Sequence, residues 1–518
     1  MQFQQRLRLH QHPMNLCLRN AGLFFVSIAL VCCVTFARAE DIYVSQNSSG
    51  TGSGLNSGNT KALSFFNTAS NWNSPTKITG KIGPGDTVHL VGTISTSLVV
   101  QGSGTSGNVI TVLFEPGAAL SKNFWGVGNN SAIVATNQQF VVIDGSNVGV
   151  IECTANGDSL ANAQQSRGMD LSRCNNWEIK RLTIRGIYVH IYNTSSAVDT
   201  RAISAFDCNS LFIHNNVITD SYYGVIAGAA SPTLTSSINI FANSISRCST
   251  GVVVGLGSVG GRLDIVQIYG NDITMGLNWY DTPDANHIDG IHNFGNFGTS
   301  DQITNMAIYN NYIHGDPSAH STGHIYLEYD IISPKIYNNV LVSQTNAGSN
   351  GFIAIKSQST TAASSAQIYN NTIIGIGTGN TGGIGVNLDA NVNAAPIIKN
   401  NIFSTLFVGI YEPQNKATIT SNFNLYYNIG TIGWRTAIST TLAQWRAAIS
   451  GEFNSISANP LIASDYRIPT FSPAAGTGTS ISLFNTDIAG TPRAVWDMGA
   501  FVAGASALPT NVALSFVP

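Results

Sequence analysis

The sequence predicts an all-β chain that winds as a single-stranded right-handed parallel β-helix, with a short helix-containing cap region at its C-terminal end. The first observation is a short phrase of Ile, Asn and a second apolar residue that recurs along the chain. The second is composition, because only 10% of the 518 residues are charged and 51 are Gly. Short strands and tight polar turns have this composition, whereas long helices do not.

The N-terminus has the pattern of a targeting segment. Arg6, Arg8 and Arg19 precede an apolar run over residues 21–34, and this run is too short to span a bilayer. Ala37-Arg38-Ala39 is a small-x-small cleavage site. We therefore expect a secretory signal peptide over residues 1–39 and a secreted, extracellular, periplasmic or cell-surface protein; the alternative is an uncleaved anchor.

The charge of the remaining chain limits its partners. Removal of residues 1–39 takes four of 24 Lys and Arg and no acid, which leaves 20 bases against 27 acids and a net charge of −7. Nucleic acid needs a basic face and is excluded as the main partner. No later run is apolar and long enough to cross a membrane. A neutral glycan, or an acidic glycan bound through a metal ion, fits this charge. We also expect the protein to be a monomer.

The repeat predicts the architecture of residues 40–430. The shared Asn stands at 216, 243, 271, 311, 339, 371 and 401, in steps of 27, 28, 40, 28, 32 and 30 residues. A Gly that opens an apolar strand follows each Asn by 8 or 12 residues, except for one offset of 19. Two strands per unit then form one turn of a wide solenoid. A leucine-rich repeat is disfavoured because the repeated residues are Ile and Asn.

Stacking of the units predicts where the repeated side chains lie. Ile should stack on Ile inside the coil, and the Asn should lie at a bend, where it tolerates left-handed backbone geometry. Asn amides stacked in register can also bond to one another. Cys174 and Cys208 each precede a strand Ile by five residues and should occupy the same place on neighbouring coils. A buried stack of free thiols is favoured there over a disulfide.

The repeats resemble those of secreted bacterial β-helix proteins of the pectin-lyase-like superfamily. The start of the chain, Ile42-Tyr-Val-Ser45 followed by Pro84-Gly-Asp-Thr-Val88, is similar to the capping segment of that group, and so are Asn459-Pro-Leu461 and Asp497-Met-Gly-Ala500. The resemblance implies fold, export and a polysaccharide partner, but it does not choose an activity. Residues 431–518 are then a C-terminal cap and tail, with a short amphipathic helix from Leu442 that ends at Gly451.

The candidate site lies where the repeat is interrupted. The long offset follows Asn271, and insertions in solenoids form loops on one face, often the binding face. Five of the ten histidines fall between residues 287 and 324. Alignment of the units on their glycines brings the histidines and acids of neighbouring coils near one another. We therefore expect His287, Asp289, His292 and His320 to be the catalytic residues. The expected substrate-binding residues are Trp279, Tyr280, Asp281, Asp284, Tyr326 and Glu328.

Each of these residues has a structural alternative. His324 can be a core residue, Asp316-Pro317 a turn, and Glu328 with Lys356 an ion pair between coils. The phrase His287-Ile-Asp-Gly-Ile291 is similar to one motif of the polygalacturonases, but the Asp-Asp pair, Gly-His-Gly and Arg-Ile-Lys motifs of that family are missing.

Two classes of function therefore remain. One is a polysaccharide lyase that uses His or Lys as a base, or a glycoside hydrolase that uses paired acids. The other is a non-catalytic glycan-binding or adhesion protein. Acidic side chains also make Ca²⁺ the candidate cofactor, although the sequence identifies no metal ligands.

Overall fold

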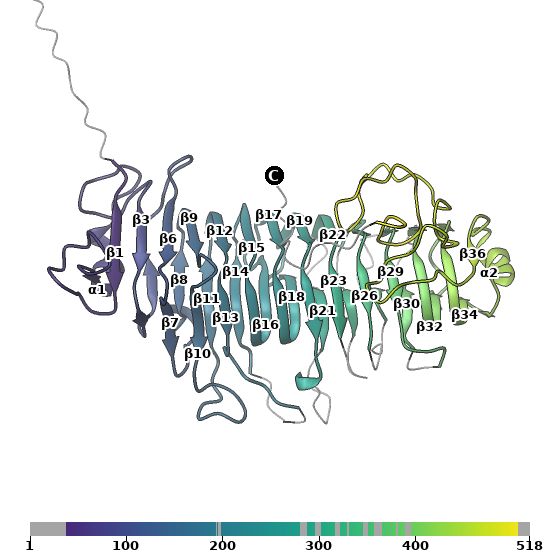
Figure 1. Ribbon diagram of the computed structural model, residues 1–518, viewed down its shortest axis with the longest axis horizontal. Coiled ribbons are helices and arrows are strands. Elements are labelled where there is room, and N and C mark those ends of the chain that lie inside the picture. The colour runs from purple at the N-terminus through teal and green to yellow at the C-terminus, as the bar shows by residue number, and fades with distance from the viewer. Residues whose placement is uncertain are drawn as a thin grey trace, which may run out of the picture. The chain divides into compact units, whose positions relative to one another are not determined.

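The structure is a computed structural model that describes residues 38–505 except 193, 195–197, 280–286, 296–301, 316–321, 329–330, 345–350, 357–364, 380–381 and 389–394. Residues 1–37, which hold nearly all of the expected signal peptide, lie outside the described residues. From Arg38 onward the chain winds into a stack of coils that advances steadily from the N-terminal end toward the C-terminal end (Figure 1). The predicted parallel β-helix is confirmed.

One row of strands forms a 14-stranded sheet. Its neighbouring strands pair in parallel, each with the equivalent strand of the next coil. The strands are β1 (Asp41–Ser45), β2 (Lys61–Ala62), β3 (Thr87–Leu90), β6 (Ile110–Phe114), β9 (Gln139–Asp144), β12 (Asn175–Lys180), β15 (Leu211–His214), β17 (Leu234–Phe241), β19 (Arg262–Tyr269), β22 (Gln302–Tyr309), β25 (Lys335–Tyr337), β28 (Gln367–Tyr369), β31 (Ile397–Lys399) and β33 (Thr420–Asn422).

The remaining strands form a 22-stranded sheet, in which only the short β35 pairs antiparallel among the described strands. They are β4 (Thr93–Ile94), β5 (Leu98–Val100), β7 (Ala119–Lys122), β8 (Ile133–Thr136), β10 (Val150–Cys153), β11 (Arg167–Ser172), β13 (Thr183–Arg185), β14 (Arg201–Phe206), β16 (Val217–Ala229), β18 (Ser244–Leu256), β20 (Asp272–Met275), β21 (Asp289–Phe294), β23 (Tyr312–Gly315), β24 (Gly323–Leu327), β26 (Val340–Val342), β27 (Ile353–Ile355), β29 (Thr372–Ile374), β30 (Ile384–Asn387), β32 (Ile402–Tyr411), β34 (Leu425–Trp434), β35 (Ile438–Ser439) and β36 (Ile456–Ser457).

This larger sheet contains two strand rows, so a turn has three strands and not the two that the repeat predicted. The Asn corner divides the repeated phrase into two strands, as β22 and β23 show on either side of Asn311. A third strand, such as β24, opens at the Gly. In four of the described coils the second and third strands are continuous: β16 and β18 are thirteen residues long, and β32 and β34 are ten.

The core is a column of isoleucines, as predicted. Each repeat places one Ile opposite the Ile of the next coil, and each is fully buried. The column contains Ile213, Ile240, Ile268, Ile308, Ile336, Ile368 and Ile398. No single coil can bury such a residue on both sides, so the stack stabilises every coil it contains.

A ladder of buried asparagines runs beside this column. Each Asn side chain donates to the next Asn side-chain oxygen at 3.0–3.1 Å, and that oxygen also accepts the backbone N–H of the preceding Asn at 2.9–3.1 Å. The side-chain N–H group of each Asn also donates to a strand carbonyl, as from Asn339 to Ile308 at 3.0 Å. The ladder confirms the prediction and extends to the weaker repeat, with members Asn216, Asn243, Asn271, Asn311, Asn339, Asn371, Asn401 and Asn424.

The left-handed backbone at each corner belongs to the residue before the ladder Asn, which corrects the prediction. These residues have φ between 51° and 63°, and most are also Asn: Asn215, Ala242, Gly270, Asn310, Asn338, Asn370, Asn400 and Phe423. The ladder Asn itself is free to turn its amide inward because its neighbour makes the turn. The Asn-Asn pairs of the repeat therefore divide the two tasks.

The four cysteines after residue 40 are all free and buried, which confirms the predicted thiol stack. The Cys208 sulfur accepts the backbone N–H of Cys174 at 3.3 Å on the neighbouring coil. The contact with the Cys174 thiol and burial raise the pKa of Cys208, so this thiol stays protonated.

Short helices lie at both ends of the stack. Helix α1 (Leu63–Asn67) packs near the first coil, and α2 (Leu442–Ile449) covers the last, with Trp445 fully buried against Gly433. Thr441 and Gln444 form a capping box at the start of α2. Its left-handed C-cap is Ser450, not the expected Gly451. Short 3₁₀ turns span Ala69–Asn71, Gly128–Asn130 and Leu277–Trp279.

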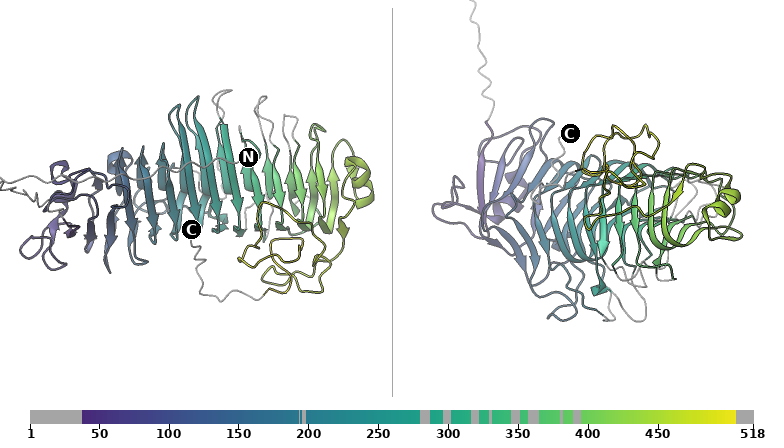
Figure 2. Two further views of the ribbon diagram at one scale, coloured as in Figure 1. Left: turned by 90° about the horizontal axis from the view of Figure 1, so that it is seen from above. Right: turned by 45° about the vertical axis from the view of Figure 1, so that its right-hand side comes forward.

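The chain beyond β36 folds back along the outside of the later coils, as Figures 1 and 2 show. Phe484 stacks on Tyr337 at 4.6 Å, and Arg493 donates to Asn338 Oδ1 at 3.0 Å. Strand β34 crosses residue 430, so the stack itself continues to Trp434.

Replacing Asn339 by Ala tests the ladder. The change removes the acceptor of two Asn311 N–H groups and the donor to Ile308. Each buried group left unpaired costs about 1–3 kcal/mol, so we expect the variant to lose at least ~3 kcal/mol of unfolding free energy. Guanidinium unfolding measures it. Asn454→Ala, at an exposed position, is the control; an equal loss in both variants contradicts the role of the ladder.

Candidate functional site

Strand β21 of the 22-stranded sheet carries two of the candidate residues, Asp289 and His292, and His287 lies just before it. Asp289 is the first residue of β21 and is 1% exposed. One of its carboxylate oxygens, Oδ1, accepts the Thr322 hydroxyl and the Gly323 backbone N–H, the latter at 2.9 Å. This carboxylate is thus tied to the next coil.

The strand register there differs from the glycine alignment that the sequence suggested. Asp289, and not Gly290, lies opposite Gly323, so β24 is shifted by one residue. The expectation that His287 and His320 lie together as catalytic residues rested on the unshifted alignment and stays a prediction. His320 itself lies outside the described residues, as do Tyr280, Asp281, Asp284 and Asp316.

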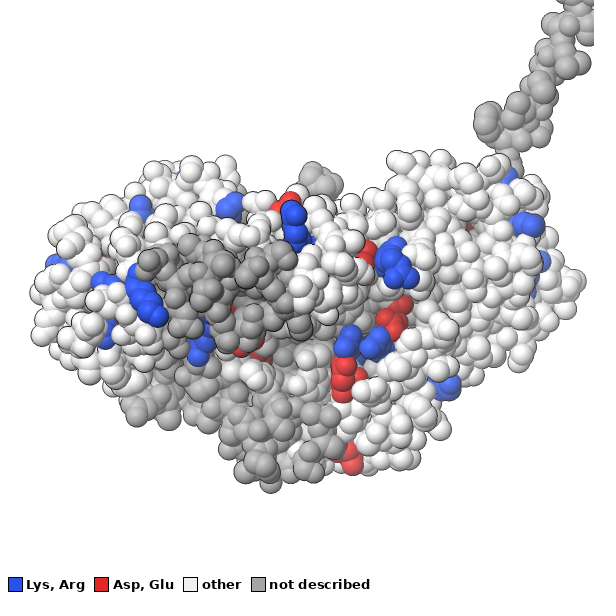
Figure 3. Space-filling view, turned by 180° about the vertical axis from the view of Figure 1, so that it is seen from behind, with Lys and Arg blue, Asp and Glu red and all other residues white. Residues whose placement is uncertain are grey.

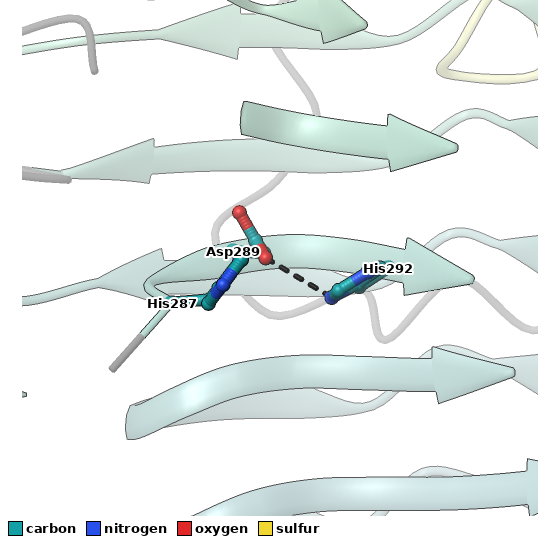
Figure 4. Close-up of side chains that lie close together, drawn as sticks. All are labelled: His287, Asp289 and His292. Carbon is teal, nitrogen blue, oxygen red and sulfur yellow. Dashed lines mark ion pairs between the residues drawn. The ribbon is translucent and has the colours of Figure 1, made fainter. Parts of the chain in front are cut away.

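His292 lies between two carboxylates. Its Nδ1 is 3.2 Å from Asp289 Oδ2, and its Nε2 is 3.4 Å from Glu328 Oε2 (Figure 4 shows the first pair). Burial alone lowers the pKa of His292, but hydrogen bonds and charges of Asp289 and Glu328 outweigh burial and raise it to about 9. Burial opposes ionisation of Glu328, yet bonds from His292 and Tyr326 hold its pKa below the usual value. His292 is therefore a cation at neutral pH.

His287 is the exposed imidazole of the group. Its backbone oxygen accepts the Ser249 hydroxyl at 2.5 Å, which fixes the chain just before β21 against β18. Its Nδ1 lies 3.3 Å from Thr322 Oγ1, and its ring stacks 5.9 Å from the His292 ring. Ring nitrogens of His287 and His292 and one Asp289 oxygen lie within 4.8 Å of one another.

Two expected substrate-binding residues are buried and play structural parts. Trp279 is 1% exposed, stacks on His190 at 4.0 Å and donates its indole N–H to the Arg247 carbonyl at 2.9 Å. A ring that is almost fully buried has little surface to offer a sugar, which disfavours the expected substrate-binding role of Trp279. Tyr326 is 5% exposed and packs edge-on against His292 at 5.0 Å, so it is a wall of the cluster.

A groove that the sequence reasoning missed adjoins this cluster. A cavity of about 340 Å³ is lined by Asp199, Arg201, Tyr222, Tyr223, Ile226 and Phe294. Strand register places Arg201, Tyr223, Thr250 and Asp289 in one row across β14, β16, β18 and β21. The groove and the cluster therefore lie on the same outer face. Tyr223, Thr250 and Asp289 each precede a repeat glycine, a signal that could have revealed the row.

Charges in the groove are largely balanced. Arg201 binds both oxygens of Asp199, at 3.0 and 2.8 Å. Burial, followed by the charges of Asp199 and Asp289, raises the pKa of Tyr222, so its hydroxyl stays protonated. The rear view likewise shows a mostly uncharged surface on which several acidic side chains adjoin basic ones (Figure 3).

Comparisons with known proteins find likeness in fold alone. No protein family matches the chain, and no curated protein matches it. Similar solved structures include a GH136 lacto-N-biosidase from Eubacterium ramulus, at 9% identity over 81% of this chain and 67% of that one, with a TM-score of 0.41. Pectate lyase Pel9A is 13% identical over 91% and 98% of the two chains, with a TM-score of 0.36.

An alginate lyase from Paenibacillus sp. str. FPU-7 is 14% identical over 76% of this chain and 97% of that one, with a TM-score of 0.35. These values are too low to carry an argument about function, which therefore depends on this chain's own residues. None of the helices in the described part is long and apolar enough to span a membrane.

His324 is a core residue, the structural alternative considered above. It is fully buried, stacks on Phe352 at 4.4 Å and has Nε2 3.2 Å from the Val342 carbonyl. Burial lowers its pKa to about 4. The unfolded chain, in which His titrates near ~6.5, then binds this proton more readily than the folded one.

Acid should therefore destabilise the protein through His324. Stability from the neutral imidazole is fully present above pH ~6.5 and falls as the pH drops toward about 4, by about 3 kcal/mol in total. We expect His324→Leu to reduce this pH dependence, measured as unfolding free energy at neutral and acidic pH. The value at neutral pH separates the packing effect of the substitution. An unchanged pH dependence contradicts the assignment.

Proposed function

We propose that this chain is an extracellular polysaccharide-processing enzyme, and that its substrate lies along the outer face of the 22-stranded sheet, across β14 to β24. The observation that carries the proposal is the row from Arg201 to Asp289, which joins a groove to a cluster of ionisable side chains. Each coil adds a step of roughly 4.8 Å, so the row offers equally spaced contacts to a repeating polymer.

Tyrosines make this groove suited to sugars. Tyr222 and Tyr223 pack edge to face, 4.5 Å apart, and both line the groove. A tyrosine presents an apolar ring together with a hydroxyl, and a sugar has both apolar faces and hydroxyl groups. The balanced charge around Arg201 and Asp199 also disfavours nucleic acid as a ligand.

The state of the carboxylates favours a lyase over a hydrolase. Hydrolysis uses two acidic side chains, one of which donates a proton to the glycosidic oxygen. Within the described part of the cluster, Asp289 is buried and bonded to the next coil, and Glu328 is bound to His292. Neither is placed to donate a proton to substrate.

Elimination fits the imidazoles better. His287 is exposed and can accept the proton of the carbon next to a sugar carboxylate, while the His292 cation stabilises negative charge that develops there. The electron pair of the broken C–H bond forms a double bond, the glycosidic oxygen leaves, and it takes a proton from water. The proposed substrate is thus an acidic, uronate-containing glycan.

His287→Ala tests this assignment. Loss of the base should lower turnover by about 100-fold or more, with an unchanged thermal midpoint because the side chain is exposed. A panel of polysaccharides is assayed for ultraviolet absorbance of an unsaturated product and for new reducing ends. His214→Ala, on the 14-stranded sheet, is the control and should keep full turnover.

The same assay separates the alternatives. Reducing ends without ultraviolet absorbance indicate a hydrolase, and glycan binding without any product indicates a binding protein. Full activity of His287→Ala places the base elsewhere.

A further inference from the structure

The three side chains of Figure 4 have the donor set of a metal site. Two imidazoles and one carboxylate converge on one side of β21, with donor atoms within 4.8 Å of one another. Asp289 contributes a buried oxygen, Oδ2, that is paired with His292 Nδ1 at 3.2 Å and has no other hydrogen-bond partner within the described part of the structure. The other oxygen of Asp289 is already bonded twice, to Thr322 and Gly323.

We propose that His287, Asp289 and His292 bind one divalent transition-metal ion of the zinc class, through Asp289 Oδ2, His292 Nδ1 and one ring nitrogen of His287. The site does not depend on the proposed glycan activity, because metal binding is measured without any glycan.

The fixed pair of ligands already has the spacing that zinc requires. Zinc bonds of about 2.1 Å in tetrahedral geometry place two ligand atoms roughly 3.4 Å apart. Asp289 Oδ2 and His292 Nδ1 lie 3.2 Å apart. The third ligand, His287, is exposed, and its ring is held within the described structure by one contact, from Nδ1 to Thr322 Oγ1 at 3.3 Å.

The surroundings orient each buried ligand as metal sites require. A metal-ligating imidazole usually bonds a carboxylate through its other nitrogen, and Glu328 takes this place on His292 Nε2. Thr322 and Gly323 hold the second oxygen of Asp289.

The ligand set favours zinc over Ca²⁺ for these residues. Calcium takes six to eight oxygen ligands, whereas imidazole suits zinc and similar ions. Three protein ligands with one exposed side leave a coordination position for water or substrate, as catalytic zinc sites do. In the ion-bound form His287 and His292 are ligands, so His287 cannot accept a proton, and we expect Zn²⁺ to inhibit the elimination proposed above.

The test is calorimetric titration of the untagged, chelator-treated protein with Zn²⁺ and, separately, Ca²⁺. We expect one Zn²⁺ per chain at this site and a far weaker response to Ca²⁺. His287→Ala should weaken that Zn²⁺ equivalent at least 10-fold, and Asp289→Asn more. Because Asp289 is buried, circular dichroism must confirm that Asp289→Asn folds. If Asp289→Asn does not fold, His287→Ala, at an exposed position, still tests the site.

Two further variants separate ligation from general electrostatics. Glu328→Gln should weaken Zn²⁺ binding about 10-fold to 100-fold through His292. His89→Ala is the matched control, because His89 also lies between two carboxylates, Asp41 and Glu115, but has no second imidazole in this arrangement. It should leave Zn²⁺ binding unchanged. Equal Zn²⁺ affinity of wild type and His287→Ala, or no Zn²⁺ bound by the wild type, overturns the proposal.

Discussion

A line of buried asparagine amides is the constraint on which the rest of this molecule depends. Each amide from Asn216 to Asn424 bonds both the side chain and the backbone of its neighbour, so one corner of every coil is held at a fixed height and register. Buried amides cannot exchange these bonds for water. Burial of the isoleucine column stabilises the stack but is non-directional, whereas the amide hydrogen bonds define which residues of successive coils lie opposite one another.

That constraint explains where the chain can vary. The corner and the Gly strand are both held in register on either side of the long offset that follows Asn271. His287 directly precedes β21, which places an exposed imidazole beside Asp289. Trp279, which follows β20, is buried against His190. The site is therefore assembled on a rigid surface from one interrupted coil.

A histidine between two carboxylates is not in itself a site, since His89 has the same surroundings near the N-terminal end. The cluster on β21 differs in two ways. It has a second, exposed imidazole, and it has a buried carboxylate oxygen with no hydrogen-bond partner besides the His292 ring in the described structure.

The sequence by itself determined the solenoid, its Asn ladder, the free thiols and the coil that carries His287, Asp289 and His292, because these features follow from spacing along one chain. The tertiary structure decided the rest: the third strand of each turn, the one-residue shift at Gly323, the burial of Trp279 and the groove beside Arg201. Each of these depends on contacts between coils some tens of residues apart. Burial and register are set by such contacts, and the spacing of a repeat along the sequence does not specify them.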